Sequence, residues 1–156
     1  MQRLFLLVVL VLGAGIARAG DGLYKASIAA PADAVYGAVY AALEERRIWV
    51  VFEADIGQNM AGMAKRWGED YNRNGLQAIR SMVACNAWLS NQVANADPDM
   101  LALCPLHVTV IEREGVSSVL FARPTSFAGD SPARDVLAEI ESNVIEAIDA
   151  ALAKLR

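Results

Sequence analysis

Apolar residues recur at helical spacing in two long segments of the chain. The first segment follows Pro31, and its pattern predicts a helix over about residues 32–46. The second follows Ser131, a typical N-cap residue, and predicts a helix that runs to the C-terminus. The stripes consist of Val35, Val39, Ala42 and Leu43 in the first helix, and of Leu137, Ile140, Val144, Ile148, Ala151, Leu152 and Leu155 in the second.

Short runs rich in β-branched and aromatic residues predict strands around these helices. We expect strands at residues 23–28, 48–54, 76–84, 108–113 and 117–122, with a hairpin turn at Glu114 and Gly115 between the last two. The helix stripes need a shared apolar surface, which a four- or five-stranded antiparallel sheet can supply. The predicted fold class is therefore α+β, a two-layer sandwich with the helices packed on one face of the sheet.

Two shorter helices are predicted between the third and the fourth strand. Asn86 can cap a helix that runs to about Asn95, since its side-chain oxygen can accept from a free amide of the first turn. Asp97 can cap a second, short piece with Pro98 at its first position, and Cys104 stops it. Cys85 thus lies just outside a helix N-terminus, and the two cysteines bracket a helical excursion between two strands.

Another helical stripe follows Asn59, which can act as its cap. Met60, Met63, Ala64 and Trp67 fall on one face of this segment, and we expect them to be core residues. Because thioethers of exported proteins can bind Cu(I), the methionine pair also leaves a copper site open.

The N-terminus has the features of a secretory signal peptide. Arg3 precedes an uninterrupted apolar run over residues 4–12, and Ala17-Arg18-Ala19 is a small-x-small cleavage pattern. The run is too short to span a membrane. We expect residues 1–19 to be removed and residues 20–156 to form a single domain, exported by the general route to the periplasm.

The charge balance narrows the class of partners. The chain carries 14 basic and 18 acidic side chains, a net charge of −4, and loss of the signal peptide would remove two arginines. Nucleic acid and anionic membrane surfaces are poor partners for an acidic domain. The 55% hydrophobic content is inflated by the signal peptide and by many alanines, and we expect no membrane span after cleavage.

The sequence does not favour an enzyme and suggests no cofactor. It contains no glycine-rich phosphate loop, no His-Glu-x-x-His zinc motif, no Cys-x-x-Cys-His haem attachment and no Gly-x-Ser-x-Gly elbow. The carboxylates show no close pairing on an apolar background that would indicate a general acid and base.

The two cysteines have two interpretations. In an oxidising compartment, a pair favours a structural disulfide between Cys85 and Cys104. If both stay thiols, Cys85 is the more reactive of the two, because the amides at a helix N-terminus stabilise a thiolate. Redox exchange or binding of a soft metal would then follow.

His107 and Arg123 complete the set of candidate ligand-binding residues. His107 follows Cys104 by three positions, and with Cys85 these residues would make an incomplete zinc set that needs a fourth ligand. A hydrogen-bonded structural role for the histidine is the alternative. Arg123 could bind an anion, although an ion pair with Glu112 is the favoured interpretation.

The cysteine segment resembles the family known as domain of unknown function 302. The resemblance rests on Ala84-Cys85-Asn86, on the run from Leu103 to Val108 and on Ala122-Arg123-Pro124, and it covers roughly Leu23 to the C-terminus. It implies a β-α-β-β-β-β-α sandwich of the TBP-like kind, which puts both cysteines at strand ends beside one helix. The form seen here is similar to the secreted branch of the family, and it implies almost nothing about activity.

Three functional hypotheses remain. The first is a non-enzymatic periplasmic protein that binds an unknown small ligand or protein partner in a pocket near Cys85, Cys104 and His107. The second is a thiol-dependent redox or sulfur-handling protein that uses Cys85 and Cys104. The third is a copper or haem binder, and in all three homodimerisation is left open.

Overall fold

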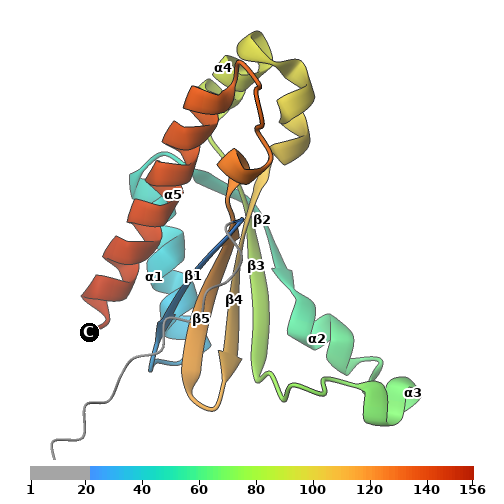
Figure 1. The fold of residues 1–156 in the computed structure, drawn as a ribbon. Helices are drawn as coiled ribbons and strands as arrows, with labels where there is room; N and C mark the ends of the chain where they lie inside the picture. The colour runs from blue at the N-terminus through green and yellow to red at the C-terminus, as the bar shows by residue number, and fades with distance from the viewer. Residues whose placement is uncertain (1–21) are drawn as a thin grey trace, which may run out of the picture.

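The computed structural model describes residues 22–156, in which two long helices cover one face of a five-stranded antiparallel sheet (Figure 1). The strands are β1 (Leu23–Ile28), β2 (Trp49–Asp55), β3 (Ala78–Cys85), β4 (Leu106–Arg113) and β5 (Val116–Ala122), in the order β1-β5-β4-β3-β2. The helices are α1 (Ala32–Glu45), α2 (Ile56–Ala61), α3 (Ala64–Trp67), α4 (Ala87–Ala96) and α5 (Arg134–Lys154). Three 3-10 turns are η1 (Gly68–Asp70), η2 (Pro98–Leu103) and η3 (Pro124–Ser126).

The core lies between the sheet and the helices α1 and α5. Val108 and Val110 point into it from β4, and Val35 and Ile148 meet them from the two helix stripes with no exposed surface. This alternation in the strand and the 3.6-residue period in the helices are the patterns on which the sequence prediction rested. The predicted α+β sandwich, with helices on one face of an antiparallel sheet, is confirmed.

The first turn of α1 is capped from the sheet. Pro31 occupies the N-cap position and offers no side-chain acceptor. The Ala32 amide donates instead to Glu112 Oε2 of β4 at 2.7 Å. A carboxylate here satisfies a free amide and lies at the positive end of the helix dipole, so Glu112 fixes α1 on the sheet.

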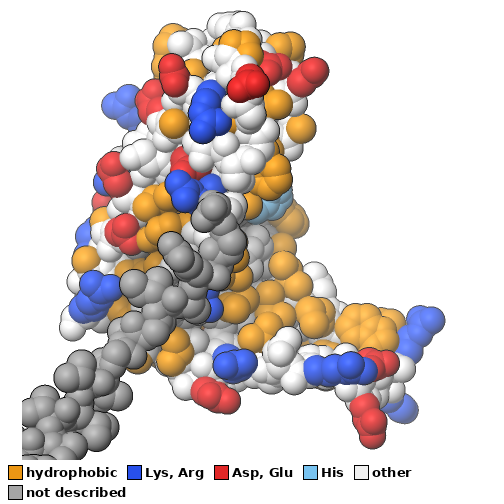
Figure 2. Space-filling view, viewed as in Figure 1, with side chains coloured by type: hydrophobic (Ala, Val, Ile, Leu, Met, Phe, Trp, Pro, Cys, Tyr) orange, Lys and Arg blue, Asp and Glu red, His pale blue; other side chains and the backbone are white. Residues whose placement is uncertain are grey.

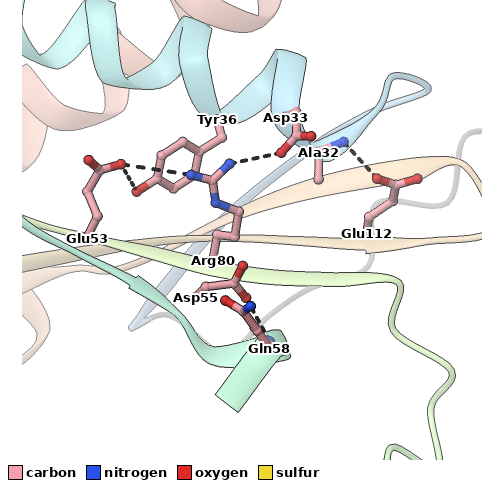
Figure 3. A network of polar contacts seen from close by, with 8 residues as sticks. All are labelled: Ala32, Asp33, Tyr36, Glu53, Asp55, Gln58, Arg80 and Glu112. Atoms are coloured by element: carbon pink, nitrogen blue, oxygen red, sulfur yellow. Dashed lines mark hydrogen bonds and ion pairs between the residues drawn. The ribbon is translucent and has the colours of Figure 1, made fainter. Parts of the chain in front are cut away.

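Arg80 of β3 joins the same end of α1 to the edge of the sheet (Figure 3). Its guanidinium lies 3.8 Å from the centroid of the Tyr36 ring and donates to Asp33 Oδ1 at 2.9 Å. The Tyr36 hydroxyl donates to Glu53 Oε2 of β2 at 2.8 Å. Burial, together with this hydrogen bond and the charge of Glu53, raises the pKa of Tyr36. The network therefore joins α1, β2 and β3 through charged and aromatic groups.

The last helix begins later than the sequence predicts. α5 starts at Arg134, and its N-cap Ala133 has no capping side chain. Ser131 lies in the preceding loop, where its hydroxyl accepts from the Ala133 amide at 3.1 Å and donates to Asp97 Oδ2 at 2.5 Å. Ser131 therefore joins this loop to the start of η2 instead of capping α5.

The segment after β2 leaves the sheet as an arm, residues 56–70, made of α2, α3 and η1. Asp55, not Asn59, caps α2, because its Oδ1 accepts from the Gln58 amide at 2.8 Å. No residue of the three elements is buried, so the prediction that the Met60 to Trp67 stripe is core is wrong. The arm projects away from the body of the molecule (Figure 1), and α2 leaves on the side of the sheet opposite α1 (Figure 3).

The predicted signal peptide and its cleavage site lie outside the described residues. Among residues 22–156, no helix combines the length and the apolar character that a membrane span requires.

The central place of α5 in the core yields a test. Replacing the fully buried Ile148 by Ala should lower the free energy of unfolding by about 2–5 kcal/mol, because the change removes packed atoms and leaves a cavity. The exposed Glu139→Ala on the same helix should stay within about 0.5 kcal/mol of the unmodified protein. Urea denaturation measures both, and equal effects at the two positions would contradict the packing described.

Candidate functional site

Cys85 is positioned by the capping of α4. Asn86 Oδ1 accepts from the Leu89 amide at 3.0 Å, as predicted, and Asn86 Nδ2 donates to the Arg47 carbonyl oxygen at 3.0 Å. Cys85 therefore occupies the position before the N-cap, and Ser90 is the fourth residue of the helix. These two positions face each other at a capped helix start. Cys85 Sγ and Ser90 Oγ accordingly lie 3.3 Å apart.

Cys104 reaches the same hydroxyl from η2. Asp97 caps this turn, as predicted, because its side chain accepts from the Asp99 amide at 3.2 Å. At the other end of the turn, the Cys104 amide donates to the Leu101 carbonyl oxygen at 2.9 Å. The Ser90 hydroxyl donates to Cys104 Sγ at 4.0 Å. In the contact between Cys85 and Ser90, either atom can be the donor. The three side chains form a chain of contacts in the order Cys85, Ser90, Cys104.

The predicted disulfide is absent, and both cysteines are free thiols. The Ser90 hydroxyl contacts both sulfur atoms, at 3.3 Å from Cys85 and 4.0 Å from Cys104. The two cysteines lie beside one helix, as expected. The expected structural cross-link between them is not present in this conformation.

The two thiols lie in a small apolar pocket. Ile48, Leu89 and Ile140 are among its lining residues, together with both cysteines, and both sulfur-bearing residues are half-buried. The pocket leaves about 10 Å³ for the centre of a water molecule. That volume corresponds to about one water molecule.

Burial acts on the Cys104 thiol. It raises the pKa of Cys104, and the nearby Cys85 adds to the effect, while the hydrogen bond from Ser90 works in the opposite direction. A raised pKa keeps Cys104 protonated at neutral pH, where the free amino acid is already mostly a thiol.

His107 does not join the cysteines. It is exposed at the start of β4, where it lies opposite Val83 in the sheet. It lines a separate, open depression beside Pro124 and Phe127. The structure thus brings two of the predicted site residues together and places the histidine elsewhere.

Arg123 pairs with Glu141 of α5 rather than with Glu112. Its Nε donates to Glu141 Oε1 at 2.7 Å, and the Thr125 amide and hydroxyl donate to Oε2 at 3.1 and 2.5 Å. Burial opposes ionisation of Glu141, but the bonds from Thr125 and Arg123 outweigh it and lower the pKa of this carboxyl group. Arg123 therefore fixes the end of β5 to α5, which is a structural role.

The methionine pair lies away from the thiols, on the arm. Met60 lines a polar cleft between the arm and the sheet, with Tyr71 and Arg80 among its other residues. Within the described part of the chain, no group of three or more His, Cys, Asp or Glu side chains is arranged to hold a metal ion.

Sequence reasoning missed Ser90 and Arg80. Ser90 follows Asn86 by four positions, and the capping geometry alone puts such a residue opposite the one before the cap. This signal was present in the sequence. The sequence held no such signal for Arg80, because its partners Asp33, Tyr36 and Glu53 contact it only when α1 packs on the sheet.

Comparison with known proteins identifies one family and one fold. The family described as "Domain of unknown function DUF302" matches residues 24–155. The structure is similar to that of the uncharacterized conserved protein DUF302 from Bacillus stearothermophilus, with a TM-score of 0.71 and 15% identity over 83% of this chain and 98% of that chain. At that identity the likeness shows the fold alone. No curated protein matches the chain.

The Glu141 cluster predicts a dependence of stability on pH. The folded pKa lies below the unfolded one, so the carboxylate contributes stability above its unfolded pKa, and this contribution is lost as the pH falls through the folded pKa. Glu141→Gln should cost about 1–3 kcal/mol of unfolding free energy near pH 7, because donors are left without their acceptor. As the pH falls into the acid range, the unfolding free energy of this variant should approach that of the unmodified protein.

Urea denaturation across the acid range measures these curves, with the exposed Glu139→Gln as control. Parallel curves for the Glu141 variant and the unmodified protein would contradict the assignment.

Proposed function

This chain belongs to the DUF302 family, and we propose that it is a thiol-dependent redox protein of the periplasm in which Cys85 and Cys104 act as one dithiol. The observation that carries the proposal is the Ser90 hydroxyl, which lies 3.3 Å from one sulfur atom and 4.0 Å from the other. Two half-buried thiols from different elements meet at one hydroxyl group in a mostly apolar pocket. That arrangement favours chemistry between the two sulfurs.

The reaction is exchange with the disulfide of a small molecule or a protein. Cys85 is the attacking thiol, because it lies beside the N-terminal amides of α4 and because burial raises the pKa of Cys104. The disulfide R–S–S–R is cleaved, one R–SH leaves with a proton, and a mixed disulfide forms on Cys85. Cys104 then loses its proton, attacks the Cys85 sulfur and releases the second R–SH. Two protein thiols are oxidised and one external disulfide is reduced.

Ser90 assists the second step by hydrogen bonding. Its hydroxyl can donate to the Cys104 sulfur as negative charge develops there, which the 4.0 Å contact already prepares. As the disulfide closes, this hydroxyl can rotate to stay in contact with the Cys104 sulfur. A serine side chain can make that rotation without moving the helix backbone.

The pocket supports this chemistry better than ligand binding. Neither His107 nor Arg123, the other two candidate ligand-binding residues, lines it. Export to the periplasm is the setting we propose, on the strength of the signal-peptide pattern at residues 1–19, and it would supply disulfide partners.

Equilibration with mixtures of reduced and oxidised glutathione tests the proposal. The number of free thiols, counted after acid quenching and alkylation, should fall from two to none in a single two-electron step as the mixture becomes more oxidising. Cys85→Ser and Cys104→Ser should each stop at a mixed disulfide with glutathione, because the second thiol is missing. Ser90→Ala should slow closure of the disulfide about fivefold, the effect of one hydrogen bond of about 1 kcal/mol.

Ser142→Ala is the matched control, since Ser142 is an exposed serine on α5 far from the thiols in sequence. It should leave the rate and the equilibrium unchanged. The proposal is wrong if the unmodified protein takes up two glutathiones, because the thiols then react independently of each other.

A further inference from the structure

The structure brings the sulfur atoms of Cys85 and Cys104 near each other without bonding them. The Ser90 hydroxyl oxygen lies 3.3 Å from Cys85 Sγ and 4.0 Å from Cys104 Sγ, so the separation of the two sulfurs cannot exceed the sum of these distances. Two sulfurs that bind one ion from opposite sides are about 4.6 Å apart, since a metal–thiolate bond is about 2.3 Å long. Rotation of the cysteine side chains between staggered rotamers can supply the remaining movement.

The pocket that both cysteines line offers sulfur as its main ligand. Of the residues that the structure describes, no His, Asp, Glu or Met lines it. The Asn86 amide group is already engaged, because it accepts from the Leu89 amide and donates to the Arg47 carbonyl oxygen. The free volume, which corresponds to about one water molecule, is enough for a single ion.

Two thiolates without a third strong ligand select a soft ion that is stable in linear coordination. Zn²⁺ takes four ligands in structural sites, and Mg²⁺ and Ca²⁺ take six or more oxygen ligands. Cu(I) prefers thiolate sulfur and forms linear complexes with two such ligands. The described residues hold no group of three or more His, Cys, Asp or Glu side chains suited to a metal, but a linear site does not need one.

The surroundings of the two sulfurs favour the charge of such a complex. Each thiol loses its proton as it binds, so one Cu(I) ion displaces two protons and leaves a complex with a charge of −1. Cys85 lies at the positive end of the α4 dipole, and the Ser90 hydroxyl contacts both sulfurs. The raised pKa of Cys104 weakens binding but does not prevent it, because a coordinating thiol is deprotonated by the metal.

We propose that Cys85 and Cys104 together bind one Cu(I) ion within a single chain, with Ser90 as the hydrogen-bonding neighbour of the sulfurs. The proposal goes beyond the exchange reaction, because it uses the same two reduced thiols but no external disulfide. Closing the disulfide and binding the ion exclude each other, since each consumes both thiols.

The other candidate copper ligands lie elsewhere. His107 lines the depression beside Pro124 and Phe127, and Met60 lines the cleft beside the arm. Hydrophobic side chains gather in the corner between the sheet and the arm (Figure 2), whereas α4 lies at the other end of the sheet (Figure 1). The copper site therefore consists of the two cysteines alone.

Competition for Cu(I) with the chromogenic chelator bicinchoninate tests the site. The reduced protein, kept free of oxygen, should take one ion per chain from the chelator, and X-ray absorption at the copper edge should show two sulfur neighbours. Cys85→Ser and Cys104→Ser should each weaken binding more than about a hundredfold, because each removes a ligand. Ser90→Ala should weaken it about tenfold, as is typical of a group that is bonded to a ligand but not to the metal.

His107→Ala and Met60→Ala are the matched controls, because these side chains line other cavities. Both variants should keep the affinity of the unmodified protein. No uptake by the reduced protein, one ion held between two chains, or nitrogen among the copper neighbours overturns the proposal. A protein that closes its disulfide in glutathione mixtures but takes up no copper overturns the copper site and leaves the exchange reaction in place.

Discussion

The capping of α4 by Asn86 is the interaction on which the candidate site depends. One amide side chain accepts from the Leu89 amide and donates to the Arg47 carbonyl, so it holds the helix start, the end of β3 and the turn after α1 in one place. Cys85 and Ser90 face each other only because of this cap. An ordinary N-cap contact therefore sets the position of the Cys85 sulfur.

Local rules predicted much of this structure from the sequence. The Asn86 and Asp97 caps, the α1 and α5 stripes and the five strands depend on spacing within one segment, and all were found within a few residues of their predicted bounds. Where the prediction failed, a distant partner decided the outcome. Glu112 lies near the β4–β5 turn and caps α1, whereas Arg123 follows the other end of β5 and pairs with Glu141. Neither choice can be read from one segment.

The arm shows a different limit of sequence reasoning. The Met60 to Trp67 stripe has the spacing of a core helix, but the segment lies outside the sheet and buries nothing within one chain. Spacing shows that a helix has an apolar side, not what covers it. The number of cysteines likewise does not show that the Ser90 hydroxyl contacts both sulfur atoms, which are not bonded to each other in the structure.

The stoichiometry of reaction with a chromogenic aromatic disulfide tests the central claim most directly. With the reagent below the protein concentration, the account predicts two released aromatic thiols for each reagent molecule, since Cys104 displaces the group first bound to Cys85. Peptide mass spectrometry should then find Cys85 bonded to Cys104. One released thiol for each reagent molecule, with the aromatic group retained on the protein, would contradict the account.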